Sequence, residues 1–248
     1  MITFVYDGSF EGFLCVVAAA YRTEGAPVGI AVEAPAQQGG LFGGIETVET
    51  DEALAGRVGQ ALETRSGASV VSKLYRAFLS EQPEVEMTLY RLIRRVIERG
   101  ADVLDDLRDA DAFRVMRLAQ QVGREVHRMH AFVRFEERSD ARYVATVRPD
   151  FNVLPLLGEH FAARYPAMRW AIVDVRRRYA LVHDDEGTRF ASAETVDAVP
   201  EAEREEAFQR MWQTYFRAVT IPERANPRLH LQHVPRRYWP YLTEKRGA

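Results

Sequence analysis

The stretch from Arg128 to Val182 constrains the fold of this chain more than any other part of the sequence. Residues 132–136 and 143–147 are rich in β-branched and aromatic side chains, and Ser139-Asp140 between them has the composition of a turn. Pro155 suits the first turn of a helix, and residues 156–164 show helical spacing. Residues 170–174 and 179–182 complete a second strand pair. The pattern predicts an α+β fold in which residues 131–182 form a central antiparallel β-β-α-β-β layer.

Helical patterns precede this layer. Apolar residues recur three or four positions apart in segments near 52–65, 69–80, 85–99 and 111–129, which predicts a helical region packed beside the sheet. Ahead of it, residues 2–6, 28–32 and 45–50 read as strands and residues 10–21 as a buried helix. Thr50 or Asp51 is expected to cap the helix that follows.

The part that follows the layer combines turn, linker and helix signals. Residues 183–187 read as a turn, and residues 191–200, which are small, polar and acidic, as a linker. A helix is expected over 202–218, and prolines at 222, 227 and 235 then exclude a long helix.

Four segments result from these patterns. They are an N-terminal strand-helix-strand segment (1–50), the helical region (51–130), the antiparallel sheet with its helix (131–192), and a C-terminal helix with a basic tail (201–248). We expect them to form one compact unit.

Composition indicates a protein of the cytoplasm. The single cysteine, Cys15, excludes an intramolecular disulfide, and this fits a reducing compartment. No apolar run is long enough for a membrane span, and the N-terminus has no basic region typical of a signal peptide.

Charge is distributed unevenly along the chain. Residues 1–60 contain eight acidic side chains and two arginines, whereas residues 210–248 contain eight basic side chains and two acidic ones. This separation creates a local positive field despite the net charge of -3, and indicates salt-sensitive binding of single-stranded or distorted DNA. The candidate nucleic-acid-binding residues are Arg224, Asn226, Arg228, Arg236, Arg237 and Tyr238.

Two observations limit that interpretation. Only Lys73 and Lys245 among the 33 basic residues are lysines, so arginine is common here for reasons other than phosphate recognition. Tyr238 and Trp239 can equally anchor the tail on the core of the protein, with the arginines solvated or paired.

Candidate catalytic residues lie on the central helix and at the end of the third strand. His160 and Arg164 are one helical turn apart, and Asp174 ends the strand 170–174. A histidine, an arginine and a carboxylate at one end of a sheet could form an acid–base or phosphate site. The simpler alternative is that Asp174 pairs with an arginine and His160 is a packing residue.

Other patterns carry weaker signals. His127-x-x-His130 and His230-x-x-His233 have metal-ligand spacing, but neither contains the His-Glu-x-x-His pattern, so we expect no metal. Asp7-Gly8-Ser9 lies between a strand and a helix without the glycines of a nucleotide-binding loop, so we interpret it as a helix cap and expect no cofactor.

Four long segments of the sequence carry a resemblance to a known family. They are FVYDGSFEGFLCVV, RMHAFVRF, PDFNVLPLLGEHFAARYPAMRWAIVD and MWQTYFRAVTIPERANPRLHLQHVPRRYWPYLTEK. These segments resemble a bacterial family of DNA-metabolism proteins, a domain of unknown function linked in genomes to a radical-SAM protein. Some members resemble the N-terminal half of fusions to a uracil-DNA-glycosylase-like domain. The resemblance implies DNA repair or modification with a radical-SAM partner, and provides no catalytic residues.

Three hypotheses follow, in this order. The first is an accessory protein of DNA repair or modification that binds nucleic acid and acts with the radical-SAM partner. The second is a nucleic-acid-processing enzyme that uses His160 and Asp174 with arginines. The third is a structural adaptor that makes no contact with DNA.

Overall fold

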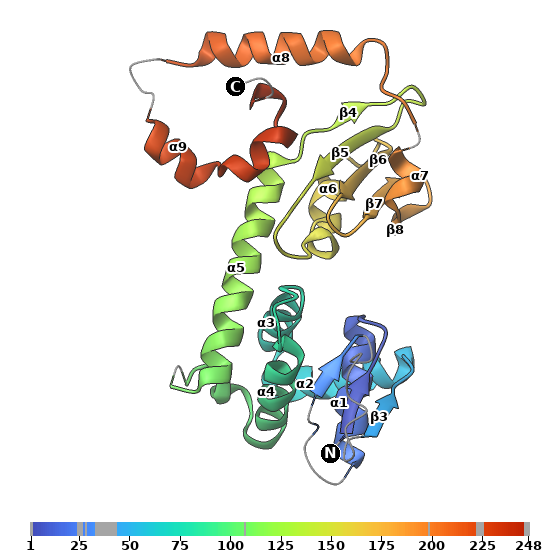
Figure 1. Cartoon of the computed structure of the whole chain (residues 1–248), viewed down its shortest axis with the longest axis vertical. Coiled ribbons are helices and arrows are strands. Elements are labelled where there is room, and N and C mark those ends of the chain that lie inside the picture. The colour runs from blue at the N-terminus through green and yellow to red at the C-terminus, as the bar shows by residue number, and fades with distance from the viewer. Residues whose placement is uncertain are drawn as a thin grey trace. The chain divides into compact units, whose positions relative to one another are not determined.

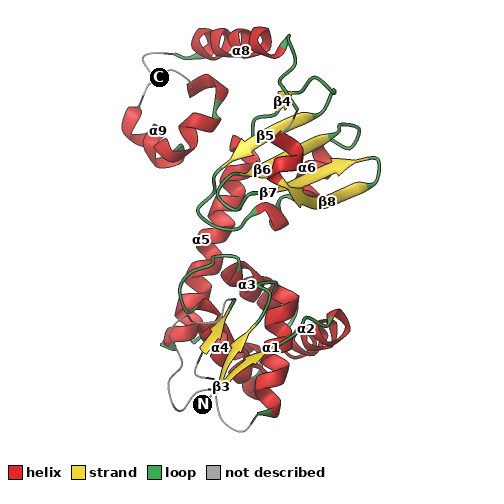
Figure 2. Ribbon diagram, turned by 45° about the vertical axis from the view of Figure 1, so that its right-hand side comes forward, coloured by secondary structure: helices red, strands yellow, loops and turns green. Residues whose placement is uncertain are grey.

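The computed structural model describes residues 2–23, 27, 29–32, 44–106, 108–197, 199–221 and 226–245. The chain divides into two compact units, residues 1–123 and 124–248 (Figures 1 and 2). Helix α5 (Ala110–Phe132) begins in the first unit and ends in the second. Segments 1–50 and 51–123 therefore share a unit, as do 131–192 and 201–248. Within the described ranges, no helix is both long and apolar enough to cross a membrane.

The first unit starts with a three-stranded parallel sheet. Its central strand β1 (Ile2–Val5) pairs with β2 (Gly29–Ala31) on one side and β3 (Gly44–Thr47) on the other. Helix α1 (Phe10–Arg22) follows β1, and the Ser9 hydroxyl caps it by accepting the Gly12 N–H at 2.9 Å. Asp7 accepts from the N–H and the hydroxyl of Ser9 at 2.9 and 2.6 Å. The interpretation of this turn as a helix cap is confirmed.

Helices form the rest of the first unit. They are α2 (Glu52–Ser66), α3 (Ala68–Phe78), α4 (Val85–Arg99), the 3-10 turn η1 (Ala101–Leu104) and the first part of α5, which agree closely with the predicted segments. Asp51 caps α2 by accepting the Leu54 N–H at 3.0 Å, as expected. Their apolar faces share one core with α1, which includes Phe13, Leu62, Leu74, Leu92 and Val115.

The second unit contains a mixed five-stranded sheet. Its order is β4-β5-β6-β7-β8, formed by β4 (Glu136–Glu137), β5 (Tyr143–Val147), β6 (Trp170–Asp174), β7 (Tyr179–Asp184) and β8 (Gly187–Ser192). Strands β5 and β6 are parallel, in register from Tyr143–Trp170 to Val147–Asp174, whereas the other pairs are antiparallel. The predicted antiparallel β-β-α-β-β layer is therefore wrong in this central pairing.

The connection between β5 and β6 explains the difference. It contains the 3-10 turn η2 (Leu154–Leu156) and helix α6 (Gly158–Arg164), and Phe161 of α6 packs against Trp170 of β6 with ring centroids 6.1 Å apart. A helical crossover carries the chain back to the end of the sheet at which the first strand began. The next strand therefore runs in the same direction as the first, and the two are parallel. Alternation of apolar residues reports which side chains share a face and carries no information on strand direction. The packing of region 51–130 beside this sheet stays a prediction.

The predicted turn over 183–187 is confirmed, because Asp185 and Glu186 form the turn between β7 and the edge strand β8. The segment read as a linker contains ordered elements: β8 covers residues 187–192, and α7 (Ala193–Asp197) follows directly. Ala193 and Val196 of α7 are buried against a cluster that includes Val173 and Val182. The linker interpretation of 191–200 is wrong for these residues, because two small apolar side chains suffice to dock a short helix on the sheet.

The C-terminal part is helical but broken, as its prolines require. It comprises α8 (Glu205–Val219), α9 (Pro227–His233) and the 3-10 helices η4 (Arg236–Tyr241) and η5 (Thr243–Lys245). Tyr238 and Leu242 are buried, which ties this segment to the rest of the second unit.

Candidate functional site

Two predicted nucleic-acid-binding residues, Arg237 and Tyr238, belong to a network around the buried Glu125 of α5. The Tyr238 hydroxyl donates to Glu125 Oε1 at 2.6 Å, and Arg237 Nη2 donates to the same atom at 3.3 Å. Glu125 also accepts the backbone N–H groups of Asp150 and Phe151 at 3.0 and 2.8 Å. Arg237 pairs with the Asp150 carboxylate at 3.0 Å. Burial, and then the hydrogen bond to Glu125, raises the pKa of Tyr238, so the phenol stays protonated. The network joins η4 to α5 and to the loop after β5.

The other tail residues are more accessible. Asn226 caps α9 by accepting the Leu229 N–H at 3.0 Å, and Arg228 and Arg236 are exposed. Arg236 lies 5.8 Å from the ring centroid of Trp239, whose indole N–H donates to the Val234 carbonyl oxygen at 3.0 Å. Arg224 lies outside the described residues. Nucleic-acid contacts of the whole set stay a prediction.

The predicted catalytic residues do not converge. Asp174 is fully buried, and its carboxylate accepts the N–H groups of Arg176 and Arg177 and pairs with Arg177 Nη1 at 2.9 Å. This arrangement closes the turn between β6 and β7. Arg164 at the end of α6 donates to the Tyr165 hydroxyl at 3.1 Å. In the described part of the chain, no hydrogen bond or ion pair joins Asp174 to His160 or Arg164.

His160 instead stacks on His130. Their ring centroids are 3.8 Å apart with planes inclined by 13°, and the buried Nε2 of His130 has no hydrogen-bond partner among the described residues. Burial, and then the charges of His160 and His127, lowers the pKa of His130, which favours the neutral ring. Across the described residues, no three His, Cys, Asp or Glu side chains are placed together to hold a metal ion.

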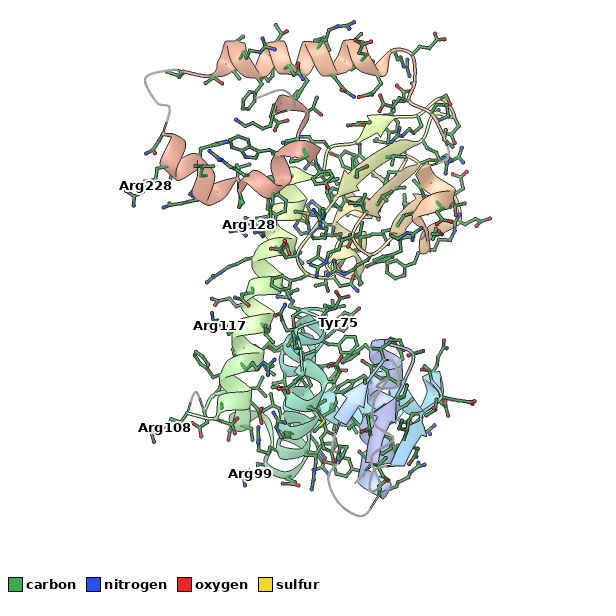
Figure 3. The ribbon with its side chains drawn as sticks, in the orientation of Figure 1. Tyr75, Arg99, Arg108, Arg117, Arg128 and Arg228 are labelled. Atoms are coloured by element: carbon green, nitrogen blue, oxygen red, sulfur yellow. The ribbon has the colours of Figure 1, made fainter. Side chains whose placement is uncertain are left out.

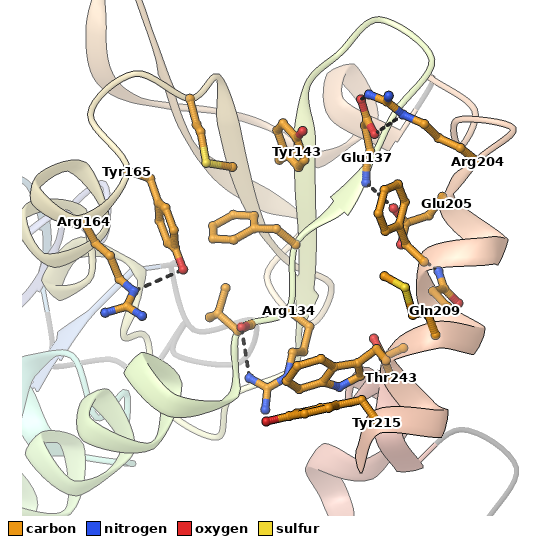
Figure 4. Close-up of a pocket in the computed structure, with 16 residues that line it drawn as sticks. Arg134, Glu137, Tyr143, Arg164, Tyr165, Arg204, Glu205, Gln209, Tyr215 and Thr243 are labelled. Carbon is orange, nitrogen blue, oxygen red and sulfur yellow. Dashed lines mark hydrogen bonds and ion pairs between the residues drawn. The ribbon is translucent and has the colours of Figure 1, made fainter. Parts of the chain in front are cut away.

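The second unit contains a groove of about 980 Å³ between α8 and the β4–β5 edge of the sheet (Figure 4). Aromatic and other apolar side chains form its two walls. One wall is formed by Phe208, Met211, Trp212 and Tyr215 of α8, and the other by Val133, Phe135, Tyr143, Tyr165 and Met168. The four α8 side chains are 41% to 61% exposed, so their apolar face is open to the groove and not packed in a core.

Hydrogen bonds attach α8 and the residue before it to β4 on one side of the groove and to η5 on the other. At one end Glu205 accepts the backbone N–H of Glu137 at 2.9 Å, and Arg204 forms a bidentate pair with the Glu137 carboxylate (Figure 4). At the other end the Trp212 indole N–H donates to Glu244 at 3.1 Å. The position of α8, and with it the groove, is therefore fixed by specific hydrogen bonds within the second unit.

The charges of the groove differ in how far they are neutralised. Arg134 is paired with Glu244 at 2.9 Å, and the Glu137 carboxylate is paired with Arg204, whose hydrogen bond lowers the pKa of Glu137. Arg164 has no acidic partner within the described ranges, and its guanidinium lies 5.5 Å from the Tyr165 ring centroid.

This combination suits one chemical class of ligand particularly well. Flat aromatic faces stack on unpaired bases, and an unneutralised guanidinium beside them binds a phosphate. Gln209 and Thr243 add polar side chains to the lining, and the Gln209 amide donates to Glu205 at 3.1 Å.

The ring-bearing face of α8 was not among the predicted site residues. Trp212 and Tyr215 lie in one of the segments that carry the family resemblance, but an apolar stripe on a helix ordinarily predicts core packing. Only the position of α8 shows that the stripe faces an open groove.

Comparison with known proteins places the chain in a family. Residues 83–244 match the family described as Domain of unknown function (DUF4130), and the chain belongs to it. No curated protein and no solved structure matches the sequence significantly.

Proposed function

We propose that this protein is a nucleic-acid-binding accessory factor of DNA repair or modification, and that it holds an unpaired base in the groove beside α8. The observation that carries the proposal is the open, ring-lined groove with Arg164 at its wall. Base–aromatic stacking requires accessible ring faces, and Phe208, Trp212 and Tyr215 offer them. The exposed Arg228 and Arg236 extend the set of cations available for phosphates in the same unit.

The substrate class follows from the shape and the chemistry of the groove. A regular duplex hides its base faces, so stacking in the groove favours single-stranded DNA or a base displaced from a damaged duplex. The family resemblance adds a radical-SAM protein as the partner that would carry out the chemistry, with this chain presenting the DNA to it.

Substituting exposed rings tests the groove without disturbing the core. Tyr215 is 56% exposed, so Tyr215→Ala should leave stability unchanged and remove one stacking surface. Each stacked base contributes about 1–3 kcal/mol, so binding of a single-stranded oligonucleotide should weaken by about tenfold. Phe190→Ala is the matched control, because Phe190 is 55% exposed on β8 and does not line the groove.

Fluorescence anisotropy with single-stranded, mismatched and regular duplex oligonucleotides, each over a salt series, gives the comparison. Arg164→Gln should also make the slope of log affinity against log salt shallower, by the amount that one lost phosphate contact contributes. Equal affinity of the parent for all three DNAs, or equal losses for Tyr215→Ala and Phe190→Ala, would contradict the proposal. Co-purification with the radical-SAM protein encoded nearby, followed by DNA binding with and without it, tests the partner.

A structural adaptor is the second candidate, and the exposed Met211 favours it. A flexible thioether beside exposed rings is typical of grooves that bind an apolar helix of a protein partner. The adaptor would be established by two results together. The radical-SAM protein copurifies with the parent but not with Tyr215→Ala, and neither the parent nor the variant binds DNA.

A further inference from the structure

We propose that the first unit contains a separate phosphate-binding site in the cleft between α3 and α5. The cleft has a volume of about 550 Å³, and Lys73, Arg76 and Arg117 line it together with Phe113 and Gln120. Nothing in the sequence motifs marks these residues, and the second unit, which holds the groove, does not contain them.

The fold brings the three cations to one place. Lys73 and Arg76 are three residues apart on α3 and therefore lie on the same face of that helix. Arg76 reaches across to α5, because a Cβ atom built on Gly123 would lie 3.4 Å from its Nη1 atom. Arg117 projects from α5 (Figure 3) and lines the same cleft.

None of the three cations is neutralised by a partner in the described part of the chain. The side chains of Lys73, Arg76 and Arg117 form neither an ion pair nor a hydrogen bond with any described residue. Elsewhere in the same unit arginines are paired closely, as Arg91 is with Asp111 at 2.7 Å. Neighbouring like charges repel each other, and a bound anion removes that repulsion.

The surroundings favour a phosphate ester over a simple halide. Two guanidinium groups provide forked donors that match the oxygens of a phosphate, and the lysine adds a point charge. The half-exposed Phe113 ring and the thioether of Met116 give the rest of the ligand an apolar surface. The phosphate can belong to a nucleic-acid strand or to a small phosphorylated molecule.

The test compares two double variants of the full chain. Arg76→Gln with Arg117→Gln removes two charges from the cleft. Arg22→Gln with Arg99→Gln removes two charges from exposed positions, at the end of α1 and at the end of α4 (Arg99 is labelled in Figure 3). The first probe is inorganic phosphate, measured as the rise in unfolding temperature against chloride at equal ionic strength. Phosphate also stabilises proteins generally by exclusion from their surface, so the relevant quantity is the difference between the two variants.

The second probe is single-stranded oligothymidylate, measured by the slope of log affinity against log salt. Each lost phosphate contact lowers this slope by about 0.7 for a single strand, so the cleft variant should lose about 1.4 and the control nothing. Arg76→Lys with Arg117→Lys keeps the charge and should recover most of both effects, which separates loss of binding from damage to the fold.

The outcomes distinguish the source of the phosphate. Loss of the phosphate-dependent temperature shift alone supports a small phosphorylated ligand, and loss of the salt slope, with or without that shift, supports a nucleic-acid strand. Retention of both effects in the cleft variant, or absence of both in the parent, overturns the proposal. This site does not rest on the groove: a protein that binds no oligonucleotide would refute the proposed function while the phosphate comparison still decides the cleft.

Discussion

Replacing Tyr238 by phenylalanine removes one hydroxyl from the network around Glu125 and keeps the aromatic ring. The hydroxyl donates to Glu125 Oε1 at 2.6 Å and accepts from Arg237 Nη2 at 2.7 Å. A hydrogen bond to a charged group contributes about 1.5–3 kcal/mol to stability. Glu125 keeps Arg237 and two backbone N–H donors in the variant, so we expect a loss near the lower end, about 2 kcal/mol.

Urea unfolding followed by tryptophan fluorescence measures this loss. With a slope of about 2 kcal/mol per molar urea, the transition should move down by about 1 M. Tyr241→Phe is the control, because Tyr241 is half-buried and donates no hydrogen bond to any described residue. It should change stability by less than about 0.5 kcal/mol.

An equal effect of the two substitutions would refute the reasoning, since it would show that the Glu125 network contributes nothing specific. A DNA-binding measurement on the same variant adds a second criterion. The ring face is kept in Tyr238→Phe, so its affinity for oligonucleotides should match the parent under conditions where both are folded.

Three further predictions concern other parts of the chain. Because burial lowers the pKa of His130 from its ordinary 6.5, the unfolded chain takes up this proton at a higher pH than the folded chain does. Stability should therefore fall as the pH is lowered through about 6.5, and fall less in His130→Gln, as thermal unfolding across pH would reveal. Gly12→Ala should destabilise the first unit by about 1–3 kcal/mol, because the new Cβ would lie 2.3 Å from Asp7 Oδ1. Urea unfolding measures this loss, and an unchanged midpoint would show that the Asp7–Ser9 turn relaxes freely. Asp174→Asn should cost about 1–3 kcal/mol through its contacts with Arg177 and leave DNA binding intact, whereas loss of binding in a stable variant would restore Asp174 as a site residue.

Local patterns were sufficient where the determining interactions are local. The four helices of residues 52–132 were predicted within a few residues, because helical periodicity and the breaks at Gly67 and Gly100 act within one or two turns. A helix cap from the Asp7–Ser9 turn was predicted for the same reason, since a capping side chain and its N–H are only a few residues apart; the structure shows that Ser9 is the cap.

Local sequence patterns did not predict features that depend on contacts between distant segments. Strand direction at β5 and β6 depends on the path of the 22-residue connection between them (148–169), and α7 is a helix only because the sheet offers its small side chains a surface. Tyr238 shows the same dependence on distant segments at the level of one residue. The sequence left open whether this side chain contacts nucleic acid or anchors the tail, and its hydroxyl donates to Glu125, a residue 113 positions earlier.

By itself, the sequence determined most of the helices, most of the strands, the polarity of charge along the chain and the resemblance to a family. The tertiary structure alone decided which side chains share a site. It directed the apolar face of α8 toward an open groove, buried Asp174 in a turn and placed Arg76 and Arg117 in one cleft. The physical reason is that periodicity within a segment is fixed by backbone geometry, whereas a site is a convergence of segments whose sequence separation leaves no local signal.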